Sequence, residues 1–215
     1  PTFLAGIARA ATDAQLSGLR YVITGAEKCP ESLYATLARR CPSLAVLEGY
    51  GITECSPVVS GNRLEDRRPG TIGRPLPSVR HAIVDPGTGR RLPPGETGLL
   101  LLQGPSIFEG YLHHDGPSPF QELEGSRWYR TGDLVREVDG SLVFAGRLKR
   151  FVKIGGEMVS LPAVEEALSQ RFGRETDEEV ILAVEATPTE ESPELVLFTI
   201  RDLSREAAHA ALRAA

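Results

Sequence analysis

Apolar and polar positions in the first 68 residues predict helices that alternate with short buried strands. Residues 5–19 are rich in alanine and residues 30–41 have apolar side chains at helical spacing, so each segment predicts a helix. Residues 21–24 and 44–47 are short apolar runs, which are typical of buried parallel strands. Each strand leads into a loop that contains glycine, and open α/β sheets bind ligands in loops at the carboxyl ends of their strands.

From about residue 69 the pattern changes to short strands between turn residues. The predicted strands are residues 79–84, 98–103, 133–137 and 141–144. Turn signals such as Asp139-Gly140 separate them, and this pair predicts a hairpin between the last two strands. The middle of the chain is therefore expected to be antiparallel β structure, in the form of a small barrel.

After Gly146 the pattern changes again and mixes helices with strands. Residues 162–171 and 204–215 are predicted helices, the second beginning at a Ser204 cap. Residues 180–185 and 195–200 are predicted strands. This order of elements indicates a small α+β domain.

Composition and charge narrow the class of protein. The chain has 215 residues, 41% of them hydrophobic and 25% charged, which is ordinary for a globular protein. A net charge of -5 disfavours a nucleic-acid-binding protein, which usually has a basic face. Cys29, Cys41 and Cys55 form no C-x-x-C pair, so we expect reduced thiols in a cytoplasmic protein rather than a zinc site or disulfides. No apolar run approaches the ~20 residues that span a bilayer, and no secretory leader is recognised.

The string YGITE, residues 50–54, brings an aromatic ring, a hydroxyl and a carboxylate together after a predicted strand. Gly49 and Gly51 permit a ligand to approach the backbone closely. Thr53 and Glu54 can organise Mg²⁺ and a phosphate oxygen, because Mg²⁺ binds one or two carboxylates together with substrate phosphates. The alternative is a loop with a buried tyrosine and a threonine that caps a helix.

Two further strings have candidate chemistry. Asp133 follows a glycine in WYRTGDL, residues 128–134, where its carboxylate can accept hydrogen bonds from both hydroxyls of a ribose. The alternative is an aspartate in a turn that enters a strand. The basic string GRLKRFVK, residues 146–153, precedes Gly155-Gly156 and predicts an anion site or a hinge, because a few residues of irregular backbone can absorb large dihedral changes. The alternative is a solvated basic turn.

The order of these strings resembles that of the adenylate-forming enzymes, which include acyl-CoA synthetases, peptide-synthetase adenylation domains and luciferases. The matching strings are GAE (25–27), YGITE (50–54), GETG (95–98) with GY (110–111), YRTGD (129–133), and GRLK (146–149) with GGE (155–157). A narrower resemblance, on GAEK, LEGY, ECSPVVS, GEMVS and ELVLFT, is to the acyl-acyl-carrier-protein synthetase domain of bacterial enzymes that also acylate 2-acylglycerophosphoethanolamine.

The resemblance implies an α/β plus β fold in three parts. Residues 1–68 would be the end of an α/β nucleotide-binding subdomain, residues 69–147 a barrel-like β subdomain, and residues 148–215 a truncated, mobile α+β domain. It also implies that ATP activates a fatty acid as acyl-AMP, after which the pantetheine thiol of acyl carrier protein takes the acyl group. Such a reaction depends on positioning and on positive charge, with no side-chain nucleophile.

Residue roles follow from the same resemblance. Glu54 would hold Mg²⁺ and Thr53 would touch the α-phosphate, while Asp133 would bind the ribose and Arg147 would lie near ribose and phosphates. Lys149 would be the hinge between the two half-reactions. The residues expected around the adenine and the pantetheine arm are Gly25, Ala26, Glu27, Gly49, Tyr50 and Gly51 for the base, and Gly155 and Gly156 for the arm.

Two strings expected from the resemblance do not occur in these residues. They are the Gly/Ser/Thr-rich phosphate loop that ends in lysine and the Gly-Lys string that supplies a catalytic lysine. We therefore expect the sequence to be a segment of a longer protein that cannot form an acyl-adenylate alone. The alternatives are a long-chain acyl-CoA synthetase, a fatty-acyl-AMP ligase, and a non-catalytic nucleotide-binding module. Any association with the cytoplasmic face of the inner membrane would depend on regions outside this sequence.

Overall fold

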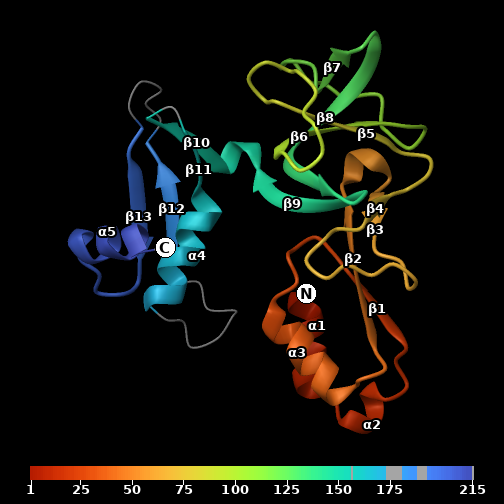
Figure 1. Ribbon diagram of the computed structural model, residues 1–215, viewed down its shortest axis with the longest axis vertical. Coiled ribbons are helices and arrows are strands. Elements are labelled where there is room, and N and C mark those ends of the chain that lie inside the picture. Colours follow the sequence, from red (N-terminus) through yellow and green to blue (C-terminus); the bar gives the residue numbers. More distant parts are fainter. Residues whose placement is uncertain (156, 173–180, 188–192, 215) are drawn as a thin grey trace. The chain divides into compact units, whose positions relative to one another are not determined.

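The computed structural model describes residues 1–155, 157–172, 181–187 and 193–214. The chain divides into two compact units, Pro1–Ala145 and Gly146–Ala215. In Figure 1 the first unit runs from red to green and the second from teal to blue. The three domain boundaries expected from the sequence stay predictions.

The first unit begins with three helices and a four-stranded sheet of order β1-β2-β3-β4. The helices α1, α2 and α3 span Thr2–Ala10, Asp13–Leu16 and Glu31–Arg40; the strands β1 to β4 span Tyr21–Thr24, Ala45–Gly51, Val58–Gly61 and Arg74–Pro75. The single helix predicted over residues 5–19 is wrong, because Thr12 begins a new helix. Its hydroxyl accepts from the Gln15 backbone N–H, and the Gln15 side chain accepts from the Thr12 backbone N–H.

The strand β2 is longer than its apolar run predicts. The glycine-containing loop expected directly after residues 44–47 is instead a continuation of β2, because Gly49 and Tyr50 pair with Gly61 and Ser60 of β3. The pairing of β1 with β2 is parallel, and the pairings from β2 through β4 are antiparallel. The fold is therefore mixed at this sheet and not wholly parallel.

Helices α1 and α3 pack together with β2 through Ala8, Leu33, Leu37 and Val46. The strand β1 was expected to be buried, and this is wrong for one of its faces. Ile23 is 73% exposed and Tyr21 is 51% exposed, whereas Thr24 is buried. An alternating pattern of exposure along β1 results.

The rest of the first unit is the antiparallel β structure that the turn pattern predicts. The five strands are β5 (Arg80–Val84), β6 (Gly98–Gln103), β7 (Phe120–Leu123), β8 (Ser126–Val138) and β9 (Ser141–Arg147). Their order is β5-β6-β8-β7, with β9 also paired to β8. The predicted hairpin is confirmed: Asp139 and Gly140 have φ values of 49° and 77°, as a turn with two left-handed residues requires.

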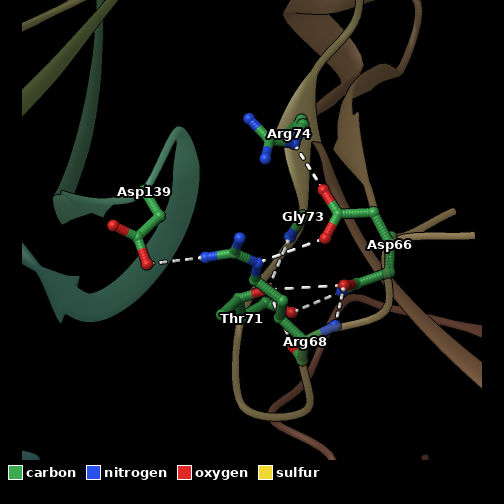
Figure 2. Close-up of polar contacts among 7 residues, drawn as sticks. Asp66, Arg68, Thr71, Gly73, Arg74 and Asp139 are labelled. Carbon is green, nitrogen blue, oxygen red and sulfur yellow. Dashed lines mark hydrogen bonds and ion pairs between the residues drawn. The ribbon is translucent and has the colours of Figure 1, made fainter.

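A polar cluster attaches residues 62–74 to the hairpin between β8 and β9. Figure 2 shows the Arg68 guanidinium between two carboxylates, with its Nη1 3.0 Å from Asp139 Oδ2 and its Nε 3.3 Å from Asp66 Oδ1. Arg74 Nε lies 2.7 Å from Asp66 Oδ2. Backbone bonds add to this attachment, because the Leu142 N–H donates to the Gly73 carbonyl at 2.8 Å.

The second unit packs two helices and short antiparallel strand pairs around its own apolar core. Its elements are β10 (Phe151–Ile154), β11 (Glu157–Ser160), α4 (Leu161–Phe172), β12 (Leu182–Ala186), β13 (Leu195–Thr199) and α5 (Arg205–Ala214). The Ser204 cap is confirmed, since its hydroxyl accepts from the Ala207 N–H at 3.2 Å. Residue 180, which begins a predicted strand, lies outside the described residues. Among the helices that the structure describes, none is both long and apolar enough to cross a membrane.

Candidate functional site

The loop after β1 lies directly against β2, and glycine makes this possible. A Cβ on Gly25 would come within 2.9 Å of the Gly49 carbonyl oxygen, which is too close for any other residue. Ala26 has a φ of 68°, in the left-handed region, so the backbone turns sharply there. The Glu27 carboxylate accepts a hydrogen bond from the Thr2 hydroxyl at 2.6 Å. The structure therefore brings the predicted Gly25–Glu27 loop next to the predicted Gly49–Gly51 string.

Tyr50 and Asp133 meet although they are 83 positions apart. The Tyr50 hydroxyl donates to Asp133 Oδ2 at 2.5 Å. Burial, followed by the charge of Asp133, raises the pKa of Tyr50, so its hydroxyl stays protonated and remains a donor. Asp133 is 2% exposed and lies inside β8, one residue after Gly132 with a φ of 75°. The alternative of an aspartate in a strand-entry turn is therefore wrong.

Thr53 and Glu54 lie in a single 3₁₀ turn, η1, which spans Thr53–Cys55 and follows β2. The residue that caps this turn is Ile52, with no side-chain hydrogen bond, so the alternative of a helix-capping threonine is wrong. Glu54 Oε1 accepts from the Tyr111 hydroxyl at 2.7 Å. The Glu54 carbonyl accepts from the Phe108 N–H at 2.9 Å. The turn is thus bound to the loop between β6 and β7.

Glu54 is the acidic residue of this turn, and its surroundings bear on the kind of cation site that it fits. Among the described residues, no three or more His, Cys, Asp or Glu side chains gather as a metal site. Mg²⁺ commonly takes one or two carboxylates and completes its coordination with substrate phosphates and water. Glu54 is half-buried, so it fits this kind of site.

Glu48 is a site residue that the sequence patterns did not indicate. It is 7% exposed, and its carboxylate accepts from the Tyr34 hydroxyl at 2.6 Å, from the Gly70 N–H at 3.1 Å and from the Cys29 N–H at 3.3 Å. These donors satisfy a buried carboxylate that would otherwise be costly. Its sequence signals were an acidic residue directly after a buried apolar run and a place in the string LEGY, and neither gave it a role.

The basic string belongs to the second unit. Arg147 ends β9, Lys149 lies in the 3₁₀ turn η2 (Leu148–Arg150), and Gly155 has a φ of 59°. Gly156 lies outside the described residues. Arg150, next to Lys149, is bound within its own unit, with Nη2 2.6 Å from Glu165 Oε1. The hinge, anion and pantetheine roles of these residues stay predictions.

The cysteines near the loops are protected thiols. Burial, and then the charge of Glu48, raises the pKa of Cys29 to about 11; burial, and then the charge of Glu54, raises the pKa of Cys55 to about 12. We expect both to react with a disulfide reagent at pH 8 at least about 100-fold more slowly in the folded chain than in urea, because the thiolate is the reacting form. Equal rates in the two states would contradict the raised pKa values. Cys29→Ser and Cys55→Ser variants show which kinetic phase of the reaction with the reagent belongs to which thiol.

Known proteins resemble the chain in sequence and in structure. It is 36% identical over 169 residues to peroxisomal OPC-8:0-CoA ligase 1 of Arabidopsis thaliana, covering 77% of this chain and 31% of that protein. It is 35% identical over 207 residues to novobiocin biosynthesis protein H of Streptomyces niveus, covering 91% of this chain and 32% of the relative. The chain thus spans about a third of the length of these curated relatives.

The structural likeness covers the whole chain. The crystal structure of ATP-bound MatB from Rhodopseudomonas palustris matches with a TM-score of 0.78 and 25% identity, over 100% of this chain and 43% of that one. The family model described as AMP-binding enzyme matches residues 1–112, which is more than half of the chain. The predicted superfamily is therefore confirmed, and the chain belongs to the AMP-binding enzyme family.

Proposed function

We propose that the whole protein joins a carboxylic acid to a thiol at the expense of ATP, and that this chain supplies the part that holds the nucleotide. The observation that supports it most is the hydrogen bond between Tyr50 and Asp133, beside the loop that contains Gly25. It brings an aromatic ring and an acceptor of ribose hydroxyls to one place. The likeness to an ATP-bound enzyme and to a CoA ligase supports the same proposal.

The chemistry assigns each residue a task. Asp133 accepts from the ribose hydroxyls, and the Tyr50 ring packs against the base. Thr53 orients the α-phosphate while the acid attacks it, and positioning of this kind can account for much of a rate enhancement. Glu54 would hold a divalent cation, which would supply positive charge to the two reacting anions. Arg147 and Lys149 serve the ribose-phosphate region and the change between half-reactions.

The finer proposal concerns the acid and the thiol. We propose a fatty acid as the acid and the pantetheine thiol of acyl carrier protein as the acceptor, in a protein at the cytoplasmic face of the inner membrane. Its support is the resemblance of the strings LEGY, ECSPVVS and GEMVS to one branch of the superfamily. Relatives named as CoA ligases support coenzyme A as the competing acceptor.

ATP–pyrophosphate exchange tests the general proposal. We expect the whole protein to exchange labelled pyrophosphate into ATP only when a carboxylic acid is present, and the 215-residue chain alone to show no exchange. Binding of AMP without exchange by the whole protein would instead support a non-catalytic nucleotide-binding module. Exchange by the chain alone would overturn the expectation that further segments are needed.

A second assay separates the acceptors. The whole protein, loaded with a fatty acid and ATP, is offered acyl carrier protein or coenzyme A at equal concentrations. Faster acylation of the carrier protein is expected, and preference for coenzyme A would contradict the finer proposal while leaving the general one intact.

A further inference from the structure

Tyr111 belongs to the string GY, and the proposed function gives it no task. It lies in the loop between β6 and β7, and its side chain is 48% exposed. Its hydroxyl donates to Glu54 Oε1 at 2.7 Å, over a separation of 57 positions. A half-exposed tyrosine therefore fixes one oxygen of the carboxylate expected to face a cation.

The loop that contains Tyr111 is bound to the Glu54 turn at two further points. The Phe108 N–H donates to the Glu54 carbonyl at 2.9 Å, and the Ser56 hydroxyl donates to the Ser106 carbonyl at 3.1 Å. One bond is donated by the loop and the other by the residue that follows the turn. Together they hold the segment that precedes Tyr111 against the Glu54 turn.

Packing holds the Tyr111 ring as well. It meets the Phe108 ring edge to face, with centroids 4.8 Å apart, and Phe108 meets the buried Tyr129 ring in the same manner at 5.3 Å. The Tyr129 phenol also forms a hydrogen bond with Tyr111. The Tyr111 ring is therefore held by Phe108 and Tyr129, while the Tyr111 hydroxyl donates to Glu54 Oε1.

A carboxylate is planar, so a bond to one oxygen fixes the direction of the other. Within the described part of the chain, Glu54 Oε2 has no hydrogen bond or ion pair, whereas Oε1 is occupied by Tyr111. A metal-binding side chain that is already oriented loses less conformational freedom when the metal binds. Residues that hydrogen-bond to such a side chain without touching the metal contribute strongly to metal affinity.

We propose that Tyr111 is a positioning residue that holds Glu54 Oε1 and presents Oε2 to the divalent cation that accompanies ATP. The proposal rests on the proposed function, since it gives Tyr111 a part in cation binding at that same site. Tyr111 itself does not contact the cation.

Binding of Mn²⁺ to the whole protein, followed by electron paramagnetic resonance with a non-hydrolysable ATP analogue present, tests the proposal. Tyr111→Phe is expected to raise the dissociation constant of Mn²⁺ about 10- to 100-fold. Affinity for the analogue without a cation is expected to stay unchanged. Tyr21→Phe, the same change at a 51% exposed residue of β1, is the matched control and is expected to have no effect.

Two further variants separate positioning from a merely structural role. In a Glu54→Gln background, Tyr111→Phe is expected to add little, because residues that act through one group are not additive. Tyr129→Phe, which leaves the Tyr111 hydroxyl in place, is expected to change Mn²⁺ binding less than Tyr111→Phe does.

Three outcomes would overturn the proposal. Wild-type affinity in Tyr111→Phe would show that the hydroxyl is not needed, and an equal loss in the Glu54→Gln background would show that it does not act through Glu54. A wild-type protein that exchanges pyrophosphate but retains no Mn²⁺ with the analogue would remove the cation from Glu54 and leave the proposed function standing. Absence of exchange would contradict the proposed function instead.

Discussion

Replacing Asp133 with alanine is expected to slow acyl-adenylate formation by the whole protein about 100- to 1,000-fold, measured as ATP–pyrophosphate exchange. Hydrogen bonds to a charged group are worth about 1.5–3 kcal/mol each, and this carboxylate is proposed to accept two from the ribose. Asp133 is 2% exposed, so water compensates poorly for the lost oxygens.

The variants Asp133→Asn and Tyr50→Phe separate the contribution of the Asp133 charge to the exchange rate from that of the Tyr50 hydroxyl. The amide of the Asp133→Asn variant would keep one acceptor oxygen but lose the charge, so an intermediate rate is expected. Tyr50→Phe keeps the ring and removes only the hydroxyl that donates to Asp133, so its effect is expected to be about tenfold or less.

Folding must be followed separately from activity in these variants. Asp133→Ala leaves the half-buried Tyr50 hydroxyl without its acceptor, which costs up to about 3 kcal/mol of stability. Fluorescence of Trp128, the single tryptophan of the chain and a buried residue of β8, reports whether the first unit is folded. A folded Asp133→Ala variant with exchange close to that of the wild type would remove the ribose role from Asp133.

The sequence patterns predicted a strand well where a continuous run of buried apolar residues forms it. The run of four leucines in β6 gave its bounds, Gly98–Gln103, because every leucine in it is buried. The strand β7 was not predicted, since Phe120–Leu123 has no such run and forms by pairing with β8. Gly132 resembles a turn residue in the sequence, yet β8 continues through it in a left-handed conformation.

The candidate site divides in the same way. Strings named the residues Tyr50 and Asp133, but their contact depends on how β2 and β8 are placed in three dimensions. Glu48 was missed because its meaning lies in its partners Tyr34 and Gly70, which no local pattern connects to it. Short sequence strings thus indicate which residues belong to the site, whereas the contacts between these residues depend on the tertiary structure.

Replacing Gly73 with alanine is expected to destabilise the first unit by about 3–5 kcal/mol, an effect large for a single methyl group. Gly73 has a φ of 74°, which costs a residue with a side chain about 1 kcal/mol or more. A Cβ there would also lie 1.9 Å from the Gly61 carbonyl carbon and 2.2 Å from the Asn62 nitrogen, so backbone atoms must move. Urea unfolding followed by Trp128 fluorescence measures the change.

Gly70→Ala provides the control that separates backbone strain from collision. Gly70 has a φ of 78°, close to that of Gly73, but a Cβ there meets nothing within 4 Å, and its N–H still donates to Glu48. The expected loss is therefore only about 1 kcal/mol. The difference between the two variants measures how tightly Gly73 is packed against Gly61 of β3 and Asn62. Because the Gly73 carbonyl also accepts from the Leu142 N–H, moving it would loosen β9 from the first sheet. Equal losses in the two variants would show that the collision relaxes without cost, and that strain alone sets the need for glycine.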